Sequence, residues 1–245
     1  MDLRPGIVTA VFDHVGIGVS DRAASKRFYV TVLRALGIEQ DYTDDELAEW
    51  GDFALSEREA AVTRRLHIGF AAPTREHVDA FWRAGTEAGY QDDGAPGPRP
   101  QYHTDYYGAF LLDPDGNSAE AVHHGALPRP GVIDHLWLRV TDVAASARFY
   151  ETIGFPLRTH TPDHVQVMGE HGSFSLVTGT PTEHIHIAFP ARDDAAVDAF
   201  HRTMTEAGYR DNGGPGERPV YHPGYYAAFV LGPDGHNVEL VNHNR

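Results

Sequence analysis

Residues 13–29 read "DHVGIGVSDRAASKRFY", and residues 134–150 read "DHLWLRVTDVAASARFY". A second matching pair follows, with "LHIGF" at residues 66–70 and "IHIAF" at residues 185–189. From this pair onward the two halves align without a gap as far as His124 and His243. The chain is therefore a tandem repeat, and a repeat of this kind governs the expected fold.

The repeat predicts one domain over residues 1–125 and a second over residues 131–245, joined by the Gly/Pro-rich connector "GALPRPG" at residues 125–131. Within each copy a short apolar strand, a helix and further strands follow one another twice. The first helix is expected from about Asp21 to Leu33, with Ser20 or Asp21 as its N-cap. The second helix follows Thr74 and ends at Gly89.

The strands that follow each helix are less evenly marked in the sequence. "DFALSE" at residues 52–57 is one candidate, whereas the acidic residues 39–63 around it have no clear pattern. "YYGAFLLD" and "NSAEAV", residues 106–113 and 117–122, predict a hairpin that closes on a Pro-Asp-Gly turn. The expected class is α+β, with four strand–helix–strand modules whose helices cover the outer face of the sheets.

Composition narrows the function. The 245 residues carry a formal net charge of −15, which argues against a nucleic-acid or anionic-membrane partner. There is no cysteine, so a metal site would have to use imidazole and carboxylate ligands. The opening "MDLRPGIVTA" lacks the apolar core of a signal peptide, and no apolar run has membrane-spanning length. A cytoplasmic protein is expected.

Alternation along the strands places polar residues on the face that the helices do not cover. In "DHVGIGV", Val15 and Ile17 face the helices and His14 faces away. Across the hairpin turn, Glu120 is expected opposite Ala109, on the same face as Tyr107, Ser118 and His124. A lone His or Glu at such a position is usually structural, but here the set recurs in both copies. A concave sheet would hold a metal on His14, His67 and Glu120 in one copy, and on His135, His186 and Glu239 in the other.

These motifs resemble the vicinal oxygen chelate superfamily, which includes glyoxalases, extradiol dioxygenases, fosfomycin-resistance enzymes and bleomycin-binding proteins. The resemblance rests on "DHVGIGVSD", "LHIGF" and "DPDGNSAE", and on "DHLWLRVTD", "IHIAF" and "GPDGHNVE" in the second copy. It implies tandem domains of paired βαβββ modules that form cup-shaped mixed sheets. It also implies the same six metal ligands and a divalent transition metal: Fe(II), Mn, Ni, Co or Zn.

The hairpin also resembles the signature of extradiol dioxygenases, with one departure. His103 and His222 occupy approximately the position of the family's His, and they are candidate acid/base residues. They could equally cap the preceding loop. Phe110 and Phe229 stand where that signature has Tyr, which disfavours ring cleavage. Tyr107 and Tyr226 are the candidate replacements for the missing hydroxyl, or else they fill space at the rim.

The two sites are expected to differ. The first strand of the second copy has Trp137 and Arg139 where the first copy has Gly16 and Gly18. Stacking by Trp and bidentate binding by Arg would suit substrate recognition, although both could instead pack between the copies. The substrate-binding candidates are Trp137, Arg139, His124 and His243. The sequence leaves open whether each site forms within one copy or takes its first-strand His from the other.

The resemblance implies a metal-dependent enzyme that chelates a small oxygen-bearing substrate and stabilises an oxyanion or enediolate. A lyase or isomerase fits the missing Tyr better than a dioxygenase does. The alternative is a resistance protein of the bleomycin-binding type that binds a small molecule without catalysis. A third possibility is a pseudo-dimer with one metal-binding copy and one structural copy. The partner would be a small molecule, and the chain would be a monomeric pseudo-dimer or a homodimer.

Overall fold

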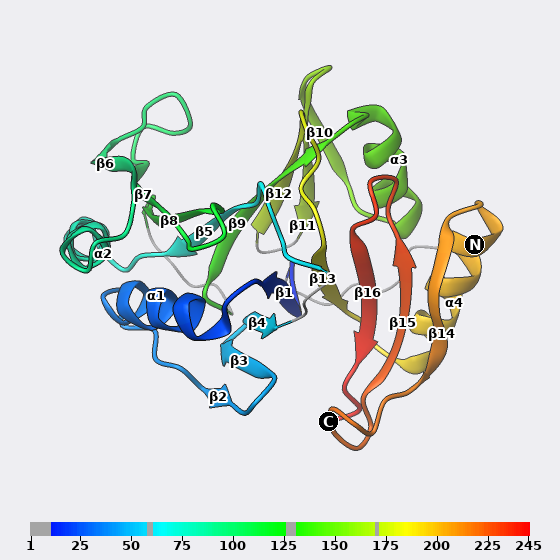
Figure 1. Ribbon diagram of the computed structural model, residues 1–245. Helices are drawn as coiled ribbons and strands as arrows, with labels where there is room; N and C mark the ends of the chain where they lie inside the picture. Colours follow the sequence, from blue (N-terminus) through cyan, green and yellow to red (C-terminus); the bar gives the residue numbers. More distant parts are fainter. Residues whose placement is uncertain (1–10, 58–60, 126–130, 170–171) are drawn as a thin grey trace. The chain divides into compact units, whose positions relative to one another are not determined.

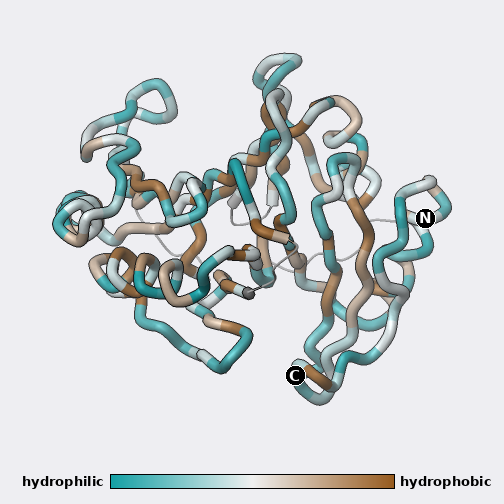
Figure 2. Tube along the Cα trace, in the orientation of Figure 1, coloured by the Kyte–Doolittle hydropathy of each residue, from teal (hydrophilic) through white to brown (hydrophobic). Residues whose placement is uncertain are grey.

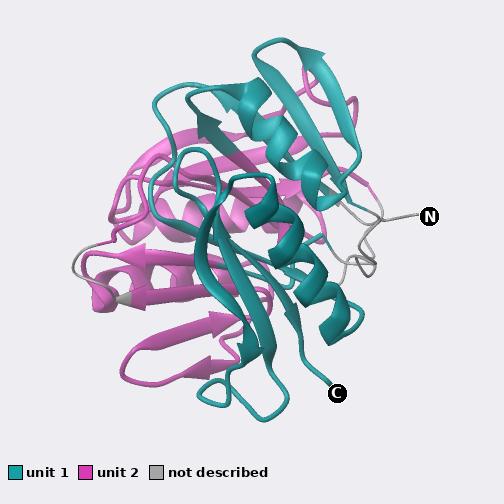
Figure 3. Ribbon diagram, turned by 90° about the vertical axis from the view of Figure 1, so that its right-hand side faces the viewer, with its two compact units in different colours: residues 1–15, 138–245 teal, residues 16–137 magenta. Residues whose placement is uncertain are grey.

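The computed structural model describes residues 11–57, 61–125, 131–169 and 172–245 (Figure 1). Most of the connector expected at residues 125–131, and the opening residues 1–10, lie outside the described residues. The chain forms two compact units (Figure 3): unit 1 holds residues up to 15 together with residues 138–245, and unit 2 holds residues 16–137. The domain limits 1–125 and 131–245 follow the sequence repeat and stay a prediction.

Unit 2 takes up most of the first copy of the repeat. Its strands follow the orders β1-β4-β3-β2 and β9-β5-β8-β7-β6, with β5 and β8 parallel. Residues 16–19 of β1 and residues 133–137 of β9 belong to it. Its elements are β1 (His14–Val19), α1 (Arg22–Arg34), β2 (Tyr42–Thr43), β3 (Leu47–Trp50), β4 (Phe53–Glu57), β5 (His67–Ala71), α2 (Arg75–Glu87), β6 (Asp92–Pro98), β7 (Tyr107–Leu112), β8 (Ser118–His123) and β9 (Ile133–Val140).

Unit 1 has the same plan. Its strands follow the orders β10-β11-β12-β9 and β14-β15-β16-β13-β1, with β13 and β16 parallel. Its further elements are α3 (Val143–Ile153), β10 (Leu157–Thr161), β11 (His164–Gly169), β12 (Gly172–Thr178), β13 (Ile185–Pro190), α4 (Asp194–Glu206), β14 (Arg210–Glu217), β15 (Tyr226–Leu231) and β16 (Asn237–Asn242). A strand, a helix and three strands thus follow one another four times, which confirms the α+β class and the four βαβββ modules.

The helices begin and end where the sequence predicts. Asp21 caps α1, because its side chain accepts a hydrogen bond from the backbone N–H of Ala24 at 2.9 Å. The apolar residues of α1 recur at helical spacing, so its path alternates between hydrophobic and hydrophilic colours in Figure 2. Helix α2 follows Thr74, and Gly89 beyond its end has a φ of +86°, a conformation that glycine adopts without strain.

Each unit buries an aromatic cluster under its first helix. In unit 2 the ring of Tyr29 lies 4.7 Å from that of Phe53, which lies 5.1 Å from Phe70. Unit 1 repeats the arrangement with Tyr150 and Phe174, whose centroids are 4.8 Å apart. These rings are fully or almost fully buried. Burial of such large apolar side chains anchors the helix-covered face of the strands and fixes which residues face the other way.

The hairpin of β7 and β8 differs from the expectation by one residue. Glu120 pairs with Phe110, and Ala109 pairs with Ala121. The turn is longer than the predicted Pro-Asp-Gly turn, because Asp113 N–H bonds the carbonyl oxygen of Asn117 at 2.9 Å and leaves three residues between them. A shift of one residue moves every side chain to the opposite face. Glu120 therefore shares its face with Phe110, and the prediction that it shares a face with Tyr107 is wrong.

Across the described parts of the chain, no helix combines the length and hydropathy that a membrane span requires.

Candidate metal centres

Unit 2 brings His67, Glu120 and His135 together from three adjacent strands, β5, β8 and β9. The Nε2 atom of His67 lies 3.0 Å from Oε2 of Glu120 and 3.2 Å from Nε2 of His135. The third side of this triangle, from His135 Nε2 to Glu120 Oε2, is 3.3 Å. The carboxylate is buried, with 1% of its side chain exposed, and both imidazoles are half-buried.

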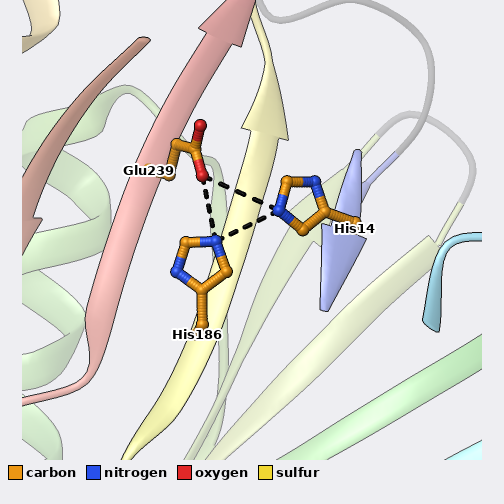
Figure 4. A group of neighbouring side chains, drawn as sticks. All are labelled: His14, His186 and Glu239. Atoms are coloured by element: carbon orange, nitrogen blue, oxygen red, sulfur yellow. Dashed lines mark hydrogen bonds and ion pairs between the residues drawn. The ribbon is translucent and has the colours of Figure 1, made fainter. Parts of the chain in front are cut away.

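Unit 1 holds a matching group of His14, His186 and Glu239, which come from β1, β13 and β16 (Figure 4). His186 Nε2 lies 2.9 Å from Glu239 Oε2, and the two imidazole Nε2 atoms are 3.1 Å apart. His14 Nε2 lies 3.7 Å from the carboxylate oxygen, so this triangle is less even than the one in unit 2. Glu239 is as deeply buried as Glu120.

The spacing of these atoms fits a first-row divalent cation. An octahedron with metal–ligand bonds of about 2.1 Å has edges of about 3.0 Å, and a tetrahedron has edges of about 3.4 Å. The sides of the unit 2 triangle, 3.0 to 3.3 Å, lie in this range. Two imidazoles and one carboxylate form a donor set that such cations accept, with positions left over for other ligands. The unit 2 residues therefore fit a metal centre in both spacing and donor set, whereas the unit 1 residues fit in donor set and have one longer side of 3.7 Å.

The electrostatics of the unit 2 group point the same way. His135 Nδ1 bonds Asp134 Oδ1 at 2.9 Å, which makes this nitrogen the donor and turns the Nε2 lone pair toward Glu120. Without a cation, a proton must take its place between the two groups. Burial alone would lower the pKa of His135, but the hydrogen bonds to Asp134 and Glu120 outweigh it and raise the pKa to about 10.

The carboxylate responds in the opposite direction. Burial alone would raise the pKa of Glu120, but the hydrogen bonds from His135 and His67 lower it to about 2. Glu120 therefore stays ionised while His135 holds an extra proton. A site that collects positive charge in this way is arranged for a cation, because a divalent metal ion satisfies all three atoms that the single proton satisfies only in part.

An outer carboxylate and a second histidine lie behind the first-strand His of each group. In unit 2, Asp134 Oδ2 accepts a hydrogen bond from His124 Nε2 at 2.8 Å. In unit 1, Asp13 Oδ1 lies 2.8 Å from His14 Nδ1, and its Oδ2 lies 2.8 Å from His243 Nε2. Despite burial, which acts to raise them, these hydrogen bonds hold the pKa values of both aspartates well below the usual range. Such carboxylates fix the tautomer and the ring orientation of a metal-binding imidazole.

A tyrosine that was not predicted from the sequence lies beside each glutamate. Tyr106 precedes β7 and donates its hydroxyl to Oε1 of Glu120 at 2.8 Å. Tyr225 does the same for Glu239 at 2.7 Å. Burial, together with the charge of the adjacent carboxylate, raises the pKa of each phenol well above its usual value, so both stay protonated. The sequence signal was present as the paired "YY" in both copies, but the register expected for the hairpin selected the wrong tyrosine.

The two predicted tyrosines lie elsewhere. Tyr107 donates its hydroxyl to Asp79 of α2 at 2.9 Å, and Tyr226 donates to Asp198 of α4 at 2.8 Å. Neither hydroxyl contacts its glutamate, because the one-residue change of register turns both rings toward the helices. Phe110, by contrast, faces the site, with its ring 5.9 Å from that of His67. The side chain at this position therefore lies beside the metal-binding group and carries no hydroxyl.

The residues predicted to contact substrate are spread over both units. Trp137 pairs with His67 across β9 and β5, and its ring lies edge-on to the imidazole at 6.4 Å and to Tyr102 at 6.0 Å. Arg139 lies two residues further along β9, in unit 1, with its side chain beside Gly179. His124 and His243 lie behind the metal-binding groups, on Asp134 and Asp13.

The candidate acid/base histidines differ between the units. His222 Nε2 lies 2.8 Å from Nδ1 of His243. His103 is exposed, and its Nδ1 accepts a hydrogen bond from the backbone N–H of Asp105 at 3.3 Å.

Glycines make room for the unit 2 group. A Cβ at Gly69 would lie 2.4 Å from the ring of His135, and one at Gly108 would lie 2.4 Å from Oε1 of Glu120. The corresponding residues of unit 1 are Ala188 and Ala227, both fully buried. The two centres therefore have different surroundings at the ligands themselves.

The sequence left open whether each metal-binding group forms within one copy of the repeat or takes its first-strand His from the other copy. In this structure each group takes that His from the other copy, which we call the exchanged pairing. His14 of the first copy lies with His186 and Glu239 of the second, and each group falls within one compact unit.

Comparison with known proteins gives the same fold. A family model described as the Glyoxalase/Bleomycin resistance protein/Dioxygenase superfamily matches residues 11–121 and again residues 132–240. Glyoxalase I from Zea mays is 20% identical, with a TM-score of 0.71 over 95% of this chain and 92% of that one. A putative dioxygenase from Bacillus subtilis is 17% identical, with a TM-score of 0.67 over 98% of this chain and 87% of that one. The search of curated proteins found no match.

Proposed function

Because the chain belongs to the glyoxalase/bleomycin resistance protein/dioxygenase superfamily, we propose that it is a divalent-metal-dependent enzyme acting on a small oxygen-bearing substrate. The observation that carries the proposal is the convergence of two imidazoles on a buried glutamate in each unit, His67 and His135 on Glu120 in unit 2 and their counterparts in unit 1. A buried carboxylate facing imidazole lone pairs is costly unless a proton or a cation lies between them.

A cation bound at these residues would supply Lewis acidity toward vicinal oxygens of a substrate and so stabilise an oxyanion or enediolate. The chain supplies the arrangement around it. Asp134 holds His135 with Nδ1 as the donor, and Tyr106 occupies one oxygen of Glu120, which leaves the other oxygen for the centre. Phe110 and Trp137 present apolar surface beside His67.

The reaction class follows from what the site lacks. A ring-cleaving dioxygenase of this family would have a tyrosine hydroxyl where Phe110 and Phe229 stand. Tyr106 is the hydroxyl nearest to Glu120, but its hydrogen bond already goes to that carboxylate, and it stays protonated. Lyase or isomerase chemistry, in which the substrate is polarised and a proton is moved, therefore fits these residues better than ring cleavage.

Metal titration tests the proposal. Protein freed of metal by chelation would be titrated separately with Zn²⁺, Mn²⁺, Ni²⁺, Co²⁺ and, without oxygen, Fe²⁺. We expect one site per unit for at least one of these metals, and loss of one site in each of Glu120→Gln and Glu239→Gln. Uptake below about a tenth of an equivalent with every metal would refute the proposal and favour the bleomycin-binding type of function.

A double variant tests the exchanged pairing. In the exchanged arrangement, His14 and Glu239 serve the same centre, so His14→Ala with Glu239→Ala should remove one site and spare the other. If each centre formed within one copy of the repeat, the same double variant would remove both. His14→Ala with Glu120→Ala is the matched control, for which the two arrangements exchange their expected results.

A further inference from the structure

Unit 1 contains a chain of hydrogen bonds that leads from the metal-binding group to the protein surface. Its links are His14, Asp13, His243 and His222, and each pair of partners is 2.8 Å apart. His222 Nδ1 also lies 2.8 Å from the carbonyl oxygen of Pro223. The two outer imidazoles lie edge to edge with nearly parallel planes, since their centroids are 5.1 Å apart and the interplanar angle is 17°.

The protons in this chain can be counted from its acceptors. The carbonyl oxygen of Pro223 only accepts, so His222 Nδ1 must carry a hydrogen. The carboxylate of Asp13 only accepts, so His243 Nε2 must carry one as well. The two remaining nitrogens face each other and need one hydrogen between them. The two rings thus require three ring hydrogens, whereas two neutral imidazoles have only two.

The surroundings of the pair suit a cation. Tyr225 lies with its ring 5.3 Å from that of His222 and 5.2 Å from that of His243, and an aromatic ring stabilises a neighbouring positive charge. The ionisable groups that face the pair are Asp13, the hydroxyl of Tyr225 with Glu239 behind it, and Glu217, which bonds the N–H of Gly224 at 3.2 Å. Among the described residues, neither ring has a hydrogen bond to a lysine or arginine.

Unit 2 does not repeat this pair, although it has both histidines. The local sequence is "YHTDYY" at residues 102–107 and "YHPGYY" at residues 221–226. Gly224 has a φ of +83°, which the corresponding Asp105 would adopt only with strain. In unit 2 the Nδ1 of His103 accepts from the N–H of Asp105, and His103 has no hydrogen bond to His124 in the described part of the chain.

We propose that His222 and His243 share one extra proton, and that His222 thereby places a positive charge behind the metal-binding group of unit 1. This inference rests on the proposed function, because it concerns how that centre is tuned. A cation behind Asp13 offsets part of its charge and repels a metal ion at His14. His222 therefore weakens metal binding in unit 1. This is the opposite of the usual effect of a residue behind a metal ligand, which is to strengthen metal binding.

The direction in which the zinc affinity of unit 1 changes when His222 is replaced tests the proposal. His222→Gln keeps a donor toward His243 Nδ1 and lets that ring be neutral, so zinc should bind unit 1 more tightly, by on the order of tenfold. His222→Phe removes both the hydrogen bond and the charge and should act in the same direction. An outer residue that only orients its neighbours would give the opposite result, with weaker binding in the Phe variant and recovery in the Gln variant. His103→Gln is the matched control and should leave the affinity of unit 2 unchanged.

A second readout does not depend on metal. Ring ¹⁵N spectra of the metal-free protein at neutral pH should show imidazolium signals that His222→Gln removes, while His103→Gln leaves them in place. Two neutral rings in the wild-type spectrum would overturn the inference, as would unchanged or weaker zinc binding in His222→Gln. If wild-type protein bound no zinc, the proposed function would fail, and the spectra would still decide whether the pair holds its extra proton.

Discussion

Asp134→Asn tests whether a proton competes with metal in unit 2. Asp134 is buried and accepts hydrogen bonds from His135 Nδ1 at 2.9 Å and from His124 Nε2 at 2.8 Å. Asparagine preserves the size of the side chain but removes its charge. The substitution should therefore change two things at once: the orientation of the His135 ring, and the strength with which that ring holds a proton when no metal is bound.

The two effects have different sizes and different pH dependence. The pKa of His135, raised to about 10, lies about three units above pH 7, so this ring holds its extra proton at neutral pH. A metal ion must displace that proton, which at pH 7 reduces the free energy of metal binding by about 4 kcal/mol. Removing one of the two carboxylates that hold the proton returns part of this amount. Loss of ring orientation works in the other direction and typically costs 10- to 100-fold in metal affinity, about 1.4 to 2.8 kcal/mol.

The assay is competition between the protein and a chelator for Zn²⁺ at several pH values between about 6.5 and 9. In the wild type the logarithm of the unit 2 affinity should rise by about one for each pH unit, because binding releases the proton of His135. In Asp134→Asn the rise should be shallower, with the largest loss of affinity at the alkaline end. Glu239→Gln serves as the background, so that only unit 2 is titrated.

A wild-type affinity that does not change with pH over this range would refute the reasoning, because His135 would then hold no proton for the metal to displace. Parallel curves for the wild type and Asp134→Asn would also contradict it, since they would show that the aspartate orients the ring without affecting its protonation.

Three further predictions concern the same centre. Tyr106→Phe should weaken metal binding in unit 2 by about 1.5 to 3 kcal/mol, because Glu120 loses a hydrogen bond from a buried donor, whereas Tyr107→Phe should leave calorimetric metal affinity unchanged. Gly108→Ala should weaken metal binding in unit 2 without abolishing it, since its Cβ would lie 2.4 Å from Oε1 of Glu120, whereas unit 1 keeps its group beside Ala227 at the corresponding position; unchanged calorimetric affinity would count against this packing. Bound Co²⁺ should quench the fluorescence of Trp137, whose ring is 6.4 Å from that of His67, and quenching that survives in Trp137→Phe would contradict the placement.

The sequence predicted the fold well because its signals are local and repeated. The cap at Asp21, the helix after Thr74 and the four strand–helix modules depend on neighbouring residues, and the repeat supplies each signal twice. The strands β2 and β3 in the acidic stretch could not be predicted from the sequence, since β2 has only two residues and both are exposed. Alternation along the strands predicted the six candidate ligands, because it placed them on the face of the sheet that the helices do not cover.

Two features of the site could not be predicted from the sequence. The register of the β7–β8 hairpin depends on a turn closed between Asp113 and Asn117, and this one-residue difference exchanged Tyr107 for Tyr106. The pairing of His14 with Glu239 is a long-range choice, and alternation along a strand says nothing about which sheet the strand joins.

The exchanged pairing also decides when each centre can exist. His67 and His135 are 68 residues apart, so the unit 2 group is complete once the chain has been synthesised past residue 135. His14 and His186 are 172 residues apart, and Glu239 follows His186 in the chain. A metal in unit 1 therefore joins residues that are far apart in the sequence and belong to different copies of the repeat. By loop-closure entropy this longer cross-link restricts the unfolded chain by about 0.8 kcal/mol more than the one in unit 2. Metal in unit 1 would thus bind after the unit 2 group is complete and would cross-link a longer stretch of the chain.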